Sequence, residues 1–423
     1  MHVKLYKRAQ EFGDFVNTVL KEEGIVKTIT LQVTDDCNLA CSYCYQICKG
    51  HRVMDIETAK EFIDLLFTGE KGFDDYLDIK HLPGVILEFI GGEPMLAVDL
   101  MDEIIDYFQE KTLTGDMKYK DRWMVSITSN GTIYTPKVKA FLKKHEHHLS
   151  YTVTIDGNKE LHDSCRKFPD GRGSYDLAIK PALDMLKTDR NFGSKITISH
   201  ENLPFLYEAV LNMIELGYRD IYANCVFEDV WQEGDEKIFY RELKKIADLM
   251  IREKLYEKIY VSLFEEYFFQ PMGEDDNENW CGGTGKMLAV DPDGKLFPCL
   301  RYMESSVGDK YPPFTIGDLE SGIGVRPAEQ SRIKCMNCIT RRSQSTDECY
   351  NCPVAKGCAW CSAGNYTCYG TPDKRTTFIC KMHKARALAN AYYFNHLYRA
   401  EGMKERIKCN LDADFVKNIL SLD

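Results

Sequence analysis

The chain has 423 residues, of which 28% are charged, and a formal net charge of −11 at pH 7. A chain of this length usually folds as two or more domains. The negative charge would repel a nucleic-acid backbone or an anionic lipid surface, and no apolar run approaches the length of about 18 residues that a membrane span needs. We therefore expect neither nucleic acid nor membrane among its partners.

Seventeen cysteines are present. The N-terminal sequence MHVKLYKRAQEFGDFV lacks the continuous apolar stretch of a secretory signal. We expect a cytoplasmic protein, because a reducing compartment keeps thiols free to bind metal instead of pairing them in disulfides.

Six short runs rich in β-branched and aromatic residues alternate with helical patterns between residues 25 and 230. The runs are VKTITLQV, VILEFIGG, WMVSITSNG, LSYTVTIDG, SKITISH and YANCVFED. Alternation of this kind is typical of βα units around a parallel sheet. The sequence therefore predicts an α/β fold whose main part is a partial (β/α)6 barrel like the TIM barrel.

Apolar residues at three- and four-residue spacing predict helices from Asp55 to Phe67 and from Leu100 to Lys111. The pattern from Ile238 to Phe269 is helical throughout, and Cys380 to Tyr398 predicts a helix that packs back onto the barrel. We divide the chain into a helical extension (1–24), a partial barrel (25–235), a helical bridge (236–270), a small cysteine-rich domain (271–385) and a C-terminal helix (386–423).

Three cysteines, Cys37, Cys41 and Cys44, come directly after the first predicted strand. Loops at that end of barrel strands build active sites. Three thiolates can hold three irons of a [4Fe–4S] cluster and leave the fourth iron open to a small molecule. The alternative is a structural zinc ion with Cys48 as its fourth ligand.

A CxxxCxxC motif with an aromatic residue, here Tyr43, before its last cysteine resembles the radical S-adenosylmethionine superfamily. In that family the open iron chelates the methionyl amine and carboxylate of S-adenosylmethionine. Reductive cleavage of the sulfonium then gives methionine and a 5′-deoxyadenosyl radical, which abstracts a hydrogen atom from the substrate. The resemblance implies that Cys37, Cys41 and Cys44 carry the cluster that cleaves the cofactor, which supplies the radical chemistry.

Further motifs follow the second, third and fourth strands in the family's order. The resemblance implies that the Gly-Gly-Glu-Pro segment meets the methionyl amine, that Thr154 contacts the ribose and that Arg166 pairs with the methionyl carboxylate. The alternatives are an ordinary turn and a surface arginine. The predicted cofactor-binding residues are Tyr43, Gly91, Gly92, Glu93, Asn130, Thr154, Asp156 and Arg166.

The cysteines after residue 270 resemble the SPASM domain, which holds two auxiliary iron–sulfur clusters in many peptide-modifying relatives. One spacing departs from that pattern, because two residues instead of three separate Cys358 from Cys361. The resemblance implies a distal cluster on Cys349, Cys352, Cys358 and Cys380 and a nearer cluster on Cys281, Cys299 and Cys361.

The usual fourth ligand of the nearer cluster is missing between Cys281 and Cys299. Cys335 or Cys338 supplies it, or that iron is open to substrate. The alternative for the whole domain is a pair of structural zinc sites. With the first cysteine group, the resemblance predicts three [4Fe–4S] clusters in addition to S-adenosylmethionine.

We predict a maturase of ribosomally made peptides (a RiPP maturase) that installs a thioether between a cysteine sulfur and a carbon of a precursor peptide. Its partners would be that peptide and a reducing protein such as a flavodoxin or ferredoxin. Formylglycine-type side-chain oxidation and carbon–carbon cross-linking are the enzymatic alternatives, and an iron–sulfur electron carrier is the non-enzymatic one. In the sulfatase-maturing branch an aspartate follows the cysteine that matches Cys299, whereas Leu300 stands there in this chain, followed by Arg301.

Overall fold

The computed structural model describes residues 26–115, 122–188, 194–266, 270–273, 276–277, 281–404 and 406–421. The predicted helical extension over residues 1–24 lies outside these ranges. None of the described helices combines the length and the apolar character that crossing a membrane requires.

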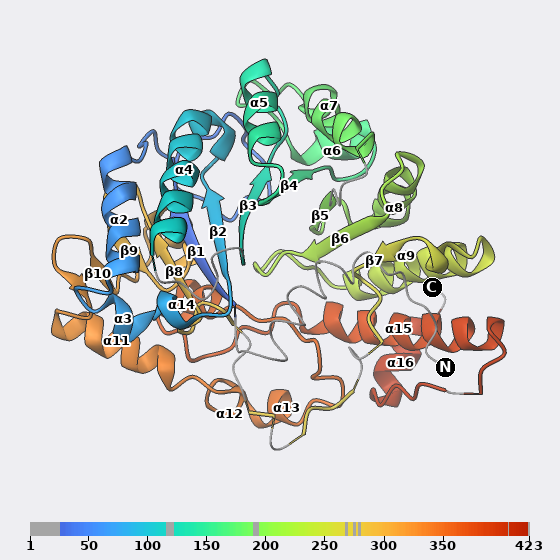
Figure 1. Ribbon diagram of the computed structural model, residues 1–423. Helices are drawn as coiled ribbons and strands as arrows, with labels where there is room; N and C mark the ends of the chain where they lie inside the picture. The colour runs from blue at the N-terminus through green and yellow to red at the C-terminus, as the bar shows by residue number, and fades with distance from the viewer. Residues whose placement is uncertain are drawn as a thin grey trace.

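The six predicted strands are confirmed, and they pair in parallel in chain order (Figure 1). Their bounds are β1 Lys27–Gln32, β2 Val85–Ile90, β3 Trp123–Ser129, β4 Leu149–Thr154, β5 Ser194–Ile198 and β6 Asp220–Cys225. The parallel arrangement brings all six carboxyl ends to one edge, so the motifs that follow the strands lie together.

The sheet continues beyond the six strands at both ends. Strand β7 (Tyr260–Val261) pairs in parallel with β6, and β8 (Met287–Val290) pairs in parallel with β1. Strands β9 (Lys295–Phe297), β10 (Gly317–Asp318) and β11 (Gly322–Ile323) follow in antiparallel order. The cysteine-rich segment is therefore joined to the barrel through β8 and β1, which fixes the two cysteine-bearing regions relative to each other.

The helical pattern predicted from Ile238 to Phe269 is wrong for the described residues between Arg252 and Glu266. Helix α9 covers Asp235–Arg252 and a short 3₁₀ turn covers Leu255–Glu257, after which the chain enters β7. The aromatic and β-branched pair Tyr260 and Val261 suits a strand, and the Tyr260 N–H donates to the Arg219 carbonyl at 2.7 Å. Pairing with β6 therefore outweighs the local helical pattern.

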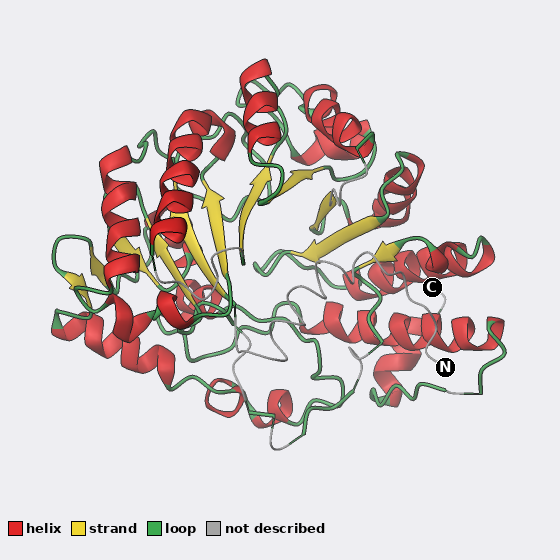
Figure 2. Cartoon of the chain, viewed as in Figure 1, coloured by secondary structure: helices red, strands yellow, loops and turns green. Residues whose placement is uncertain are grey.

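Helices cover the outer face of the curved sheet, as Figures 1 and 2 show. They are α2 Ile56–Thr68, α3 Phe73–Tyr76, α4 Val98–Thr114, α5 Pro136–Lys144, α6 Lys159–Cys165, α7 Tyr175–Leu186 and α8 Leu206–Glu215. The helices predicted around residues 55–67 and 100–111 are thus confirmed as α2 and α4. Asp55 caps α2 through a hydrogen bond to the Glu57 N–H, which fixes where that helix begins.

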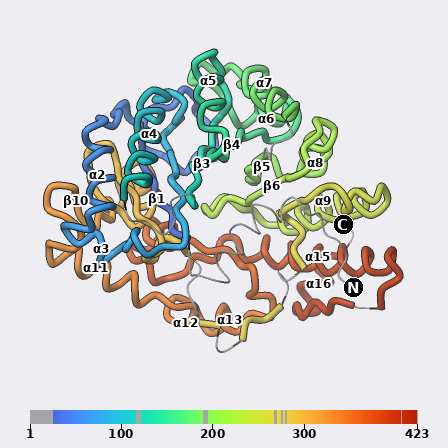
Figure 3. Tube along the Cα trace, viewed as in Figure 1, coloured from blue at the N-terminus to red at the C-terminus, as the bar shows by residue number. Residues whose placement is uncertain are grey.

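The C-terminal part lies on the open side of the sheet (Figure 3). Its helices are α10 Glu304–Val307, α11 Pro327–Asn337, α12 Arg341–Gln344, α13 Asp347–Tyr350, α14 Ser362–Tyr369, α15 Cys380–Ala400 and α16 Ala413–Leu420. The predicted helix from residue 380 is confirmed as α15, which packs along α9. The other predicted boundaries between domains stay predictions.

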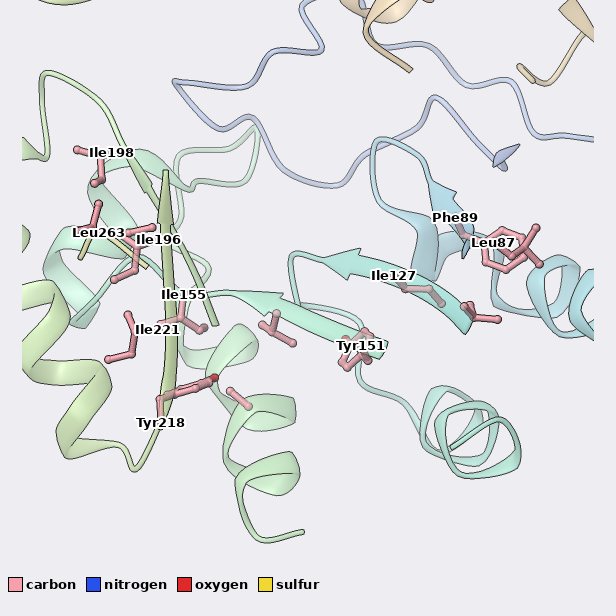
Figure 4. Close-up of a cluster of buried hydrophobic side chains, with 14 of the residues drawn as sticks. Leu87, Phe89, Ile127, Tyr151, Ile155, Ile196, Ile198, Tyr218, Ile221 and Leu263 are labelled. Carbon is pink, nitrogen blue, oxygen red and sulfur yellow. The ribbon is translucent and has the colours of Figure 1, made fainter. Parts of the chain in front are cut away.

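The two faces of the barrel sheet differ in character. Side chains directed at the helices form the hydrophobic core, among them Leu87, Phe89, Ile127 and Ile196 (Figure 4). The alternate side chains of β2, β3 and β5 are half-buried or exposed. The inner face is therefore not a packed core, unlike that of a closed TIM barrel, and it leaves polar side chains facing the C-terminal part.

Candidate active site

The loop that carries Cys37, Cys41 and Cys44 follows β1 and rests on the segment after α6. The Ala40 N–H donates to the Lys167 carbonyl at 2.7 Å, and the Ser42 N–H donates to the Cys165 carbonyl at 3.0 Å. These two bonds flank Arg166 in the sequence. They bring that arginine beside the cysteine loop, where it interacts electrostatically with Cys41.

The Gly-Gly-Glu-Pro segment after β2 supports the same loop. The Gly92 N–H donates to the Thr34 carbonyl at 3.1 Å, and the Glu93 N–H donates to the Asp36 carbonyl at 2.8 Å. A Cβ atom on Gly92 would lie 2.3 Å from the Asp36 carbonyl oxygen and 2.5 Å from the Cys37 Cβ. Glycine is needed at position 92 because the cysteine loop passes directly over its backbone.

The Glu93 carboxylate is buried and accepts three hydrogen bonds from the protein. Its Oε1 accepts from the Met95 N–H at 3.0 Å and from the Ser129 hydroxyl at 2.7 Å. Its Oε2 accepts from the Asn130 N–H at 2.7 Å. Burial raises the pKa of Glu93, and these hydrogen bonds oppose the rise. Glu93 thus joins the ends of β2 and β3, and its contact with a methionyl amine stays a prediction.

Asn130 also reaches the cysteine loop through its side chain. Its Nδ2 donates to the Asn38 Oδ1 at 2.8 Å, and the Asn38 Nδ2 donates to the Thr132 hydroxyl at 2.7 Å. Asn38 stands between the first two cysteines of the motif. The sequence prediction missed Asn38, although its place inside the motif marks it as a candidate for holding the loop.

Tyr43, Asp156 and Arg166 form one hydrogen-bonded network. The Tyr43 hydroxyl donates to the Asp156 carboxylate, and the Arg166 Nη1 donates to the Tyr43 oxygen at 2.9 Å. The other Asp156 oxygen accepts from the Thr197 N–H at 3.0 Å. Burial raises the pKa of Asp156, and the nearby Arg166 guanidinium opposes that rise.

Arg166 is buried, which rules out the alternative of a surface arginine. Its Nε is also buried and has no hydrogen-bond partner in the described part of the chain. A buried guanidinium N–H without an acceptor is costly, so this atom fits an anionic ligand lying beside Cys41. The side chain of Thr154, another predicted cofactor contact, is buried at the end of β4.

His162 links two members of this network, although the sequence prediction did not include it. Its Nδ1 accepts from the Asp156 N–H at 3.3 Å, so its Nε2 carries the proton and donates to the Ser174 hydroxyl at 3.0 Å. Ser174 in turn donates to the Arg166 carbonyl at 2.8 Å. Burial, aided by the charge of Arg166, lowers the pKa of His162 to about 3. The neutral imidazole therefore fixes the backbone at Asp156 and Arg166.

Burial raises the pKa of the Cys37 thiol, and it raises the pKa of Cys41 to about 11. Two cations oppose these shifts: Lys49 acts on both thiols, and Arg166 acts on Cys41. Lys49 also fixes the loop, because its Nζ donates to the Leu39 carbonyl at 2.7 Å. Buried thiols with raised pKa values release protons when they bind metal, so binding at this loop depends on pH.

In the described ranges, Asp102, Asp106 and His145 are the one group of three ligand atoms that lie within 4.8 Å of one another. The Lys144 ammonium lies 2.9 Å from Asp102 and 2.6 Å from Asp106, so that group already has its cation. The alternatives of a cluster and a structural zinc ion at the cysteine groups therefore stay open.

The C-terminal cysteines gather in two groups. Cys281, Cys299 and Cys361 interact electrostatically with one another, and Cys361 caps α14 by accepting the Gly364 N–H at 3.3 Å. The second group consists of Cys349, Cys352, Cys358 and Cys380. Both groups have the membership that the SPASM pattern implies.

Cys335 and Cys338 interact electrostatically with each other. Burial raises the pKa of Cys335, and the charges of Asp373 and Cys338 add to this rise. The role of either cysteine as the fourth ligand of the nearer group stays a prediction.

Tyr45 and Arg301 connect the first cysteine loop to the nearer auxiliary group. Tyr45 follows Cys44, and the Arg301 guanidinium lies 4.8 Å from the centre of its ring. Arg301 also pairs with Glu228. Because Tyr45 interacts electrostatically with both Cys44 and Cys299, both cysteine sites lie near this stacked pair.

Comparison with known proteins gives a family match and several relatives. The family model described as a 4Fe-4S single cluster domain matches residues 22–180. The radical SAM cyclopropyl synthase TigE of Paramaledivibacter caminithermalis is 23% identical over 390 residues, which are 85% of this chain and 71% of TigE. The serine-type anaerobic sulfatase-maturating enzyme of Bacteroides thetaiotaomicron is 22% identical over 390 residues, 85% of this chain and 86% of that enzyme.

An uncharacterized protein of Methanocaldococcus jannaschii is 30% identical over 196 residues, and the match spans 46% of this chain and 61% of the archaeal protein. Among solved structures, anSMEcpe with bound AdoMet and the Cp18Cys peptide has a TM-score of 0.63 at 16% identity, covering 89% of this chain and 99% of that one. Streptococcus suis SuiB bound to its precursor peptide SuiA has a TM-score of 0.58 at 13% identity, covering 87% and 80%. Both structures share this fold.

The partial barrel, the three-thiol loop at its mouth and the cysteine-rich C-terminal part are the features expected of an iron–sulfur protein. Over most of its length the chain is similar to radical S-adenosylmethionine enzymes that modify peptides or proteins.

Proposed function

We propose that this protein is a radical S-adenosylmethionine maturase that installs a thioether in a ribosomally made precursor peptide. The observation that carries the proposal is the pairing of two three-thiol groups near the Tyr45–Arg301 stack. One group lies beside a buried arginine with an unpartnered Nε. The other consists of Cys281, Cys299 and Cys361, which interact electrostatically with one another.

The first group would hold the cluster that binds S-adenosylmethionine. When bound, cluster and cofactor together supply a 5′-deoxyadenosyl radical. Lys49 and Arg166 favour the thiolate forms of the cysteines. Arg166 would receive the methionyl carboxylate at its free Nε, while Tyr43, Asp156 and the His162–Ser174 pair hold its guanidinium and backbone in place.

Gly91 and Gly92 would let the cofactor and the cysteine loop approach the same backbone. Asn130 would keep the loop closed through Asn38, and Thr154 would contact the ribose. In the C-terminal part, Cys349, Cys352, Cys358 and Cys380 would hold the distal cluster. With the nearer group, this gives three [4Fe–4S] clusters.

Two observations favour thioether formation over formylglycine formation. No carboxylate follows Cys299, because Leu300 and Arg301 stand there and Arg301 is engaged by Glu228 and Tyr45. A three-thiol site next to the reaction centre also leaves room for a substrate thiol, which metal coordination would deprotonate. Carbon–carbon bond formation is the second candidate, favoured by the likeness to TigE over 85% of this chain.

The partners in this proposal are a precursor peptide and a reducing protein such as a flavodoxin or ferredoxin. Incubation of the reconstituted protein with S-adenosylmethionine, a reductant and candidate cysteine peptides tests the proposal. A product lighter than the peptide by two hydrogen atoms, with one thiol fewer available to alkylation, supports thioether formation. The same mass loss with all thiols intact supports a carbon–carbon bond or the oxidation of a serine instead, whereas replacement of one thiol by an aldehyde, with loss of its sulfur, supports formylglycine formation from cysteine.

A further inference from the structure

The inner face of the sheet carries a lysine whose charge no described residue neutralises by direct contact. Lys195 on β5 is half-buried, and within the described ranges it makes neither a hydrogen bond nor an ion pair. Register places Lys195 beside Thr154 of β4 and Tyr222 of β6. Paired residues of adjacent parallel strands point to the same face, so the ammonium lies on the inner face with the predicted ribose contact Thr154.

Lys195 lies between the two cysteine sites. It interacts electrostatically with Asp156 and Arg166 on the side of the first cysteine loop, and with Arg301 on the side of Cys299. Its pKa is lowered, chiefly by burial. An ammonium in this position is largely withdrawn from water and lies within electrostatic range of residues beside both cysteine sites.

The other charged groups around Lys195 already have partners. Arg166 reaches Asp156 through the Tyr43 hydroxyl, and Arg301 pairs with Glu228. Glu88 lies within electrostatic range of Lys195, but its Oε2 accepts the Thr30 hydroxyl at 2.7 Å and it forms no ion pair with Lys195. Within the described part of the chain no carboxylate contacts the Lys195 ammonium directly, so an anionic group of a bound molecule would pair with it favourably.

We infer that Lys195 binds a carboxylate of the substrate, from an acidic side chain or a chain terminus close to the residue that is modified. The inference rests on the proposed function, because a substrate must occupy the space between the two cysteine sites. The carboxylate of S-adenosylmethionine is the other source of the same chemistry. Arg166, with its unpartnered Nε beside Cys41, is better placed for that carboxylate.

The test uses two probes that differ only in charge: N-acetyl-L-cysteine, which has a carboxylate, and N-acetyl-L-cysteinamide, which does not. Dissociation constants are measured by anaerobic calorimetry on the cluster-loaded protein with S-adenosylmethionine bound. A charged hydrogen bond of this kind predicts that the acid binds about tenfold more tightly than the amide. Lys195→Met should reduce this ratio to about one, whereas Lys195→Arg should preserve most of it.

Lys180→Met is the matched control, because Lys180 is exposed on α7 and the same substitution there should leave the ratio unchanged. Equal iron contents in all variants show that they fold alike. A wild-type protein that does not distinguish acid from amide overturns the inference, as does an unchanged ratio in Lys195→Met. If Lys195→Met leaves the ratio unchanged and weakens the binding of S-adenosylmethionine, Lys195 binds the cofactor, and the inference is overturned. Formation of 5′-deoxyadenosine by the wild type reports on the proposed function alone.

Discussion

Replacing Arg166 by Ala should weaken the binding of S-adenosylmethionine far more than it disturbs the fold. The guanidinium is buried, one of its nitrogens donates to Tyr43 at 2.9 Å, and its Nε has no partner in the described part of the chain. Removing one partner of a buried charge pair costs about 2 to 5 kcal/mol. Since 1.4 kcal/mol corresponds to a factor of ten, we expect the dissociation constant to rise about 30-fold or more.

The assay is calorimetric titration of S-adenosylmethionine into the reconstituted protein, with iron content measured in the same samples. Arg172→Ala is the matched control, because Arg172 is exposed on the same segment, where it pairs with Asp170 and lies over the Phe168 ring. Tyr43→Phe distinguishes the positioning of Arg166 from its direct contact with the cofactor, since it removes the hydroxyl that holds Arg166 but leaves the guanidinium. It should raise the dissociation constant less than Arg166→Ala does. An unchanged affinity in Arg166→Ala at full iron content would refute the reasoning.

Three further predictions concern the loop, the network and the outlying cysteines. Gly92→Ala should remove the iron of the first cluster, about four atoms, because the added Cβ would collide with Asp36 and Cys37. Gly273→Ala is the control, since a Cβ there would meet no atom within 4 Å and the iron content should not change. Equal iron contents in the two variants would contradict the packing argument. His162 has a pKa near 3 in the folded protein and about 6.5 when unfolded, so its contribution to stability is complete above pH 6.5 and falls with pH toward 3. Urea titrations should show His162→Gln flattening that slope, which is at most about 1.4 kcal/mol per pH unit for one group, and an unaltered slope contradicts the assignment. Replacing Cys335 and Cys338 together by Ala should leave the iron content unchanged, whereas a loss of about four irons would make one of them a cluster ligand.

The sequence predicted the barrel well because its signals are local. Each of β1 to β6 is a short run rich in β-branched and aromatic residues that a helical pattern follows, and the first four strands are followed by a cysteine motif or a polar motif. It failed at β7, where two residues form a strand only because β6 offers a free edge. It also did not predict that Met287–Val290 pairs with β1, since that contact joins segments about 260 residues apart.

In the candidate site, too, the residues that belong to local motifs were predicted, and those that depend on long-range contacts were not. The cysteines and Arg166 stand in motifs with fixed spacing, so they were identified from the sequence. His162, Lys49 and Lys195 matter because of what the fold places beside them, and no motif contains them. His162 lies four residues before Arg166 on a short helix, which is the one local signal that singles it out.

The central claim is that the cysteine loop after β1 carries a cluster that cleaves S-adenosylmethionine. The most direct measurement is the formation of 5′-deoxyadenosine and methionine by anaerobically reconstituted protein under a strong reductant. We predict both products from the wild type, and none from a variant with Ala at Cys37, Cys41 and Cys44 that keeps its remaining iron. Cleavage by that triple variant, or a wild-type preparation that binds only zinc and forms no 5′-deoxyadenosine, would contradict the account.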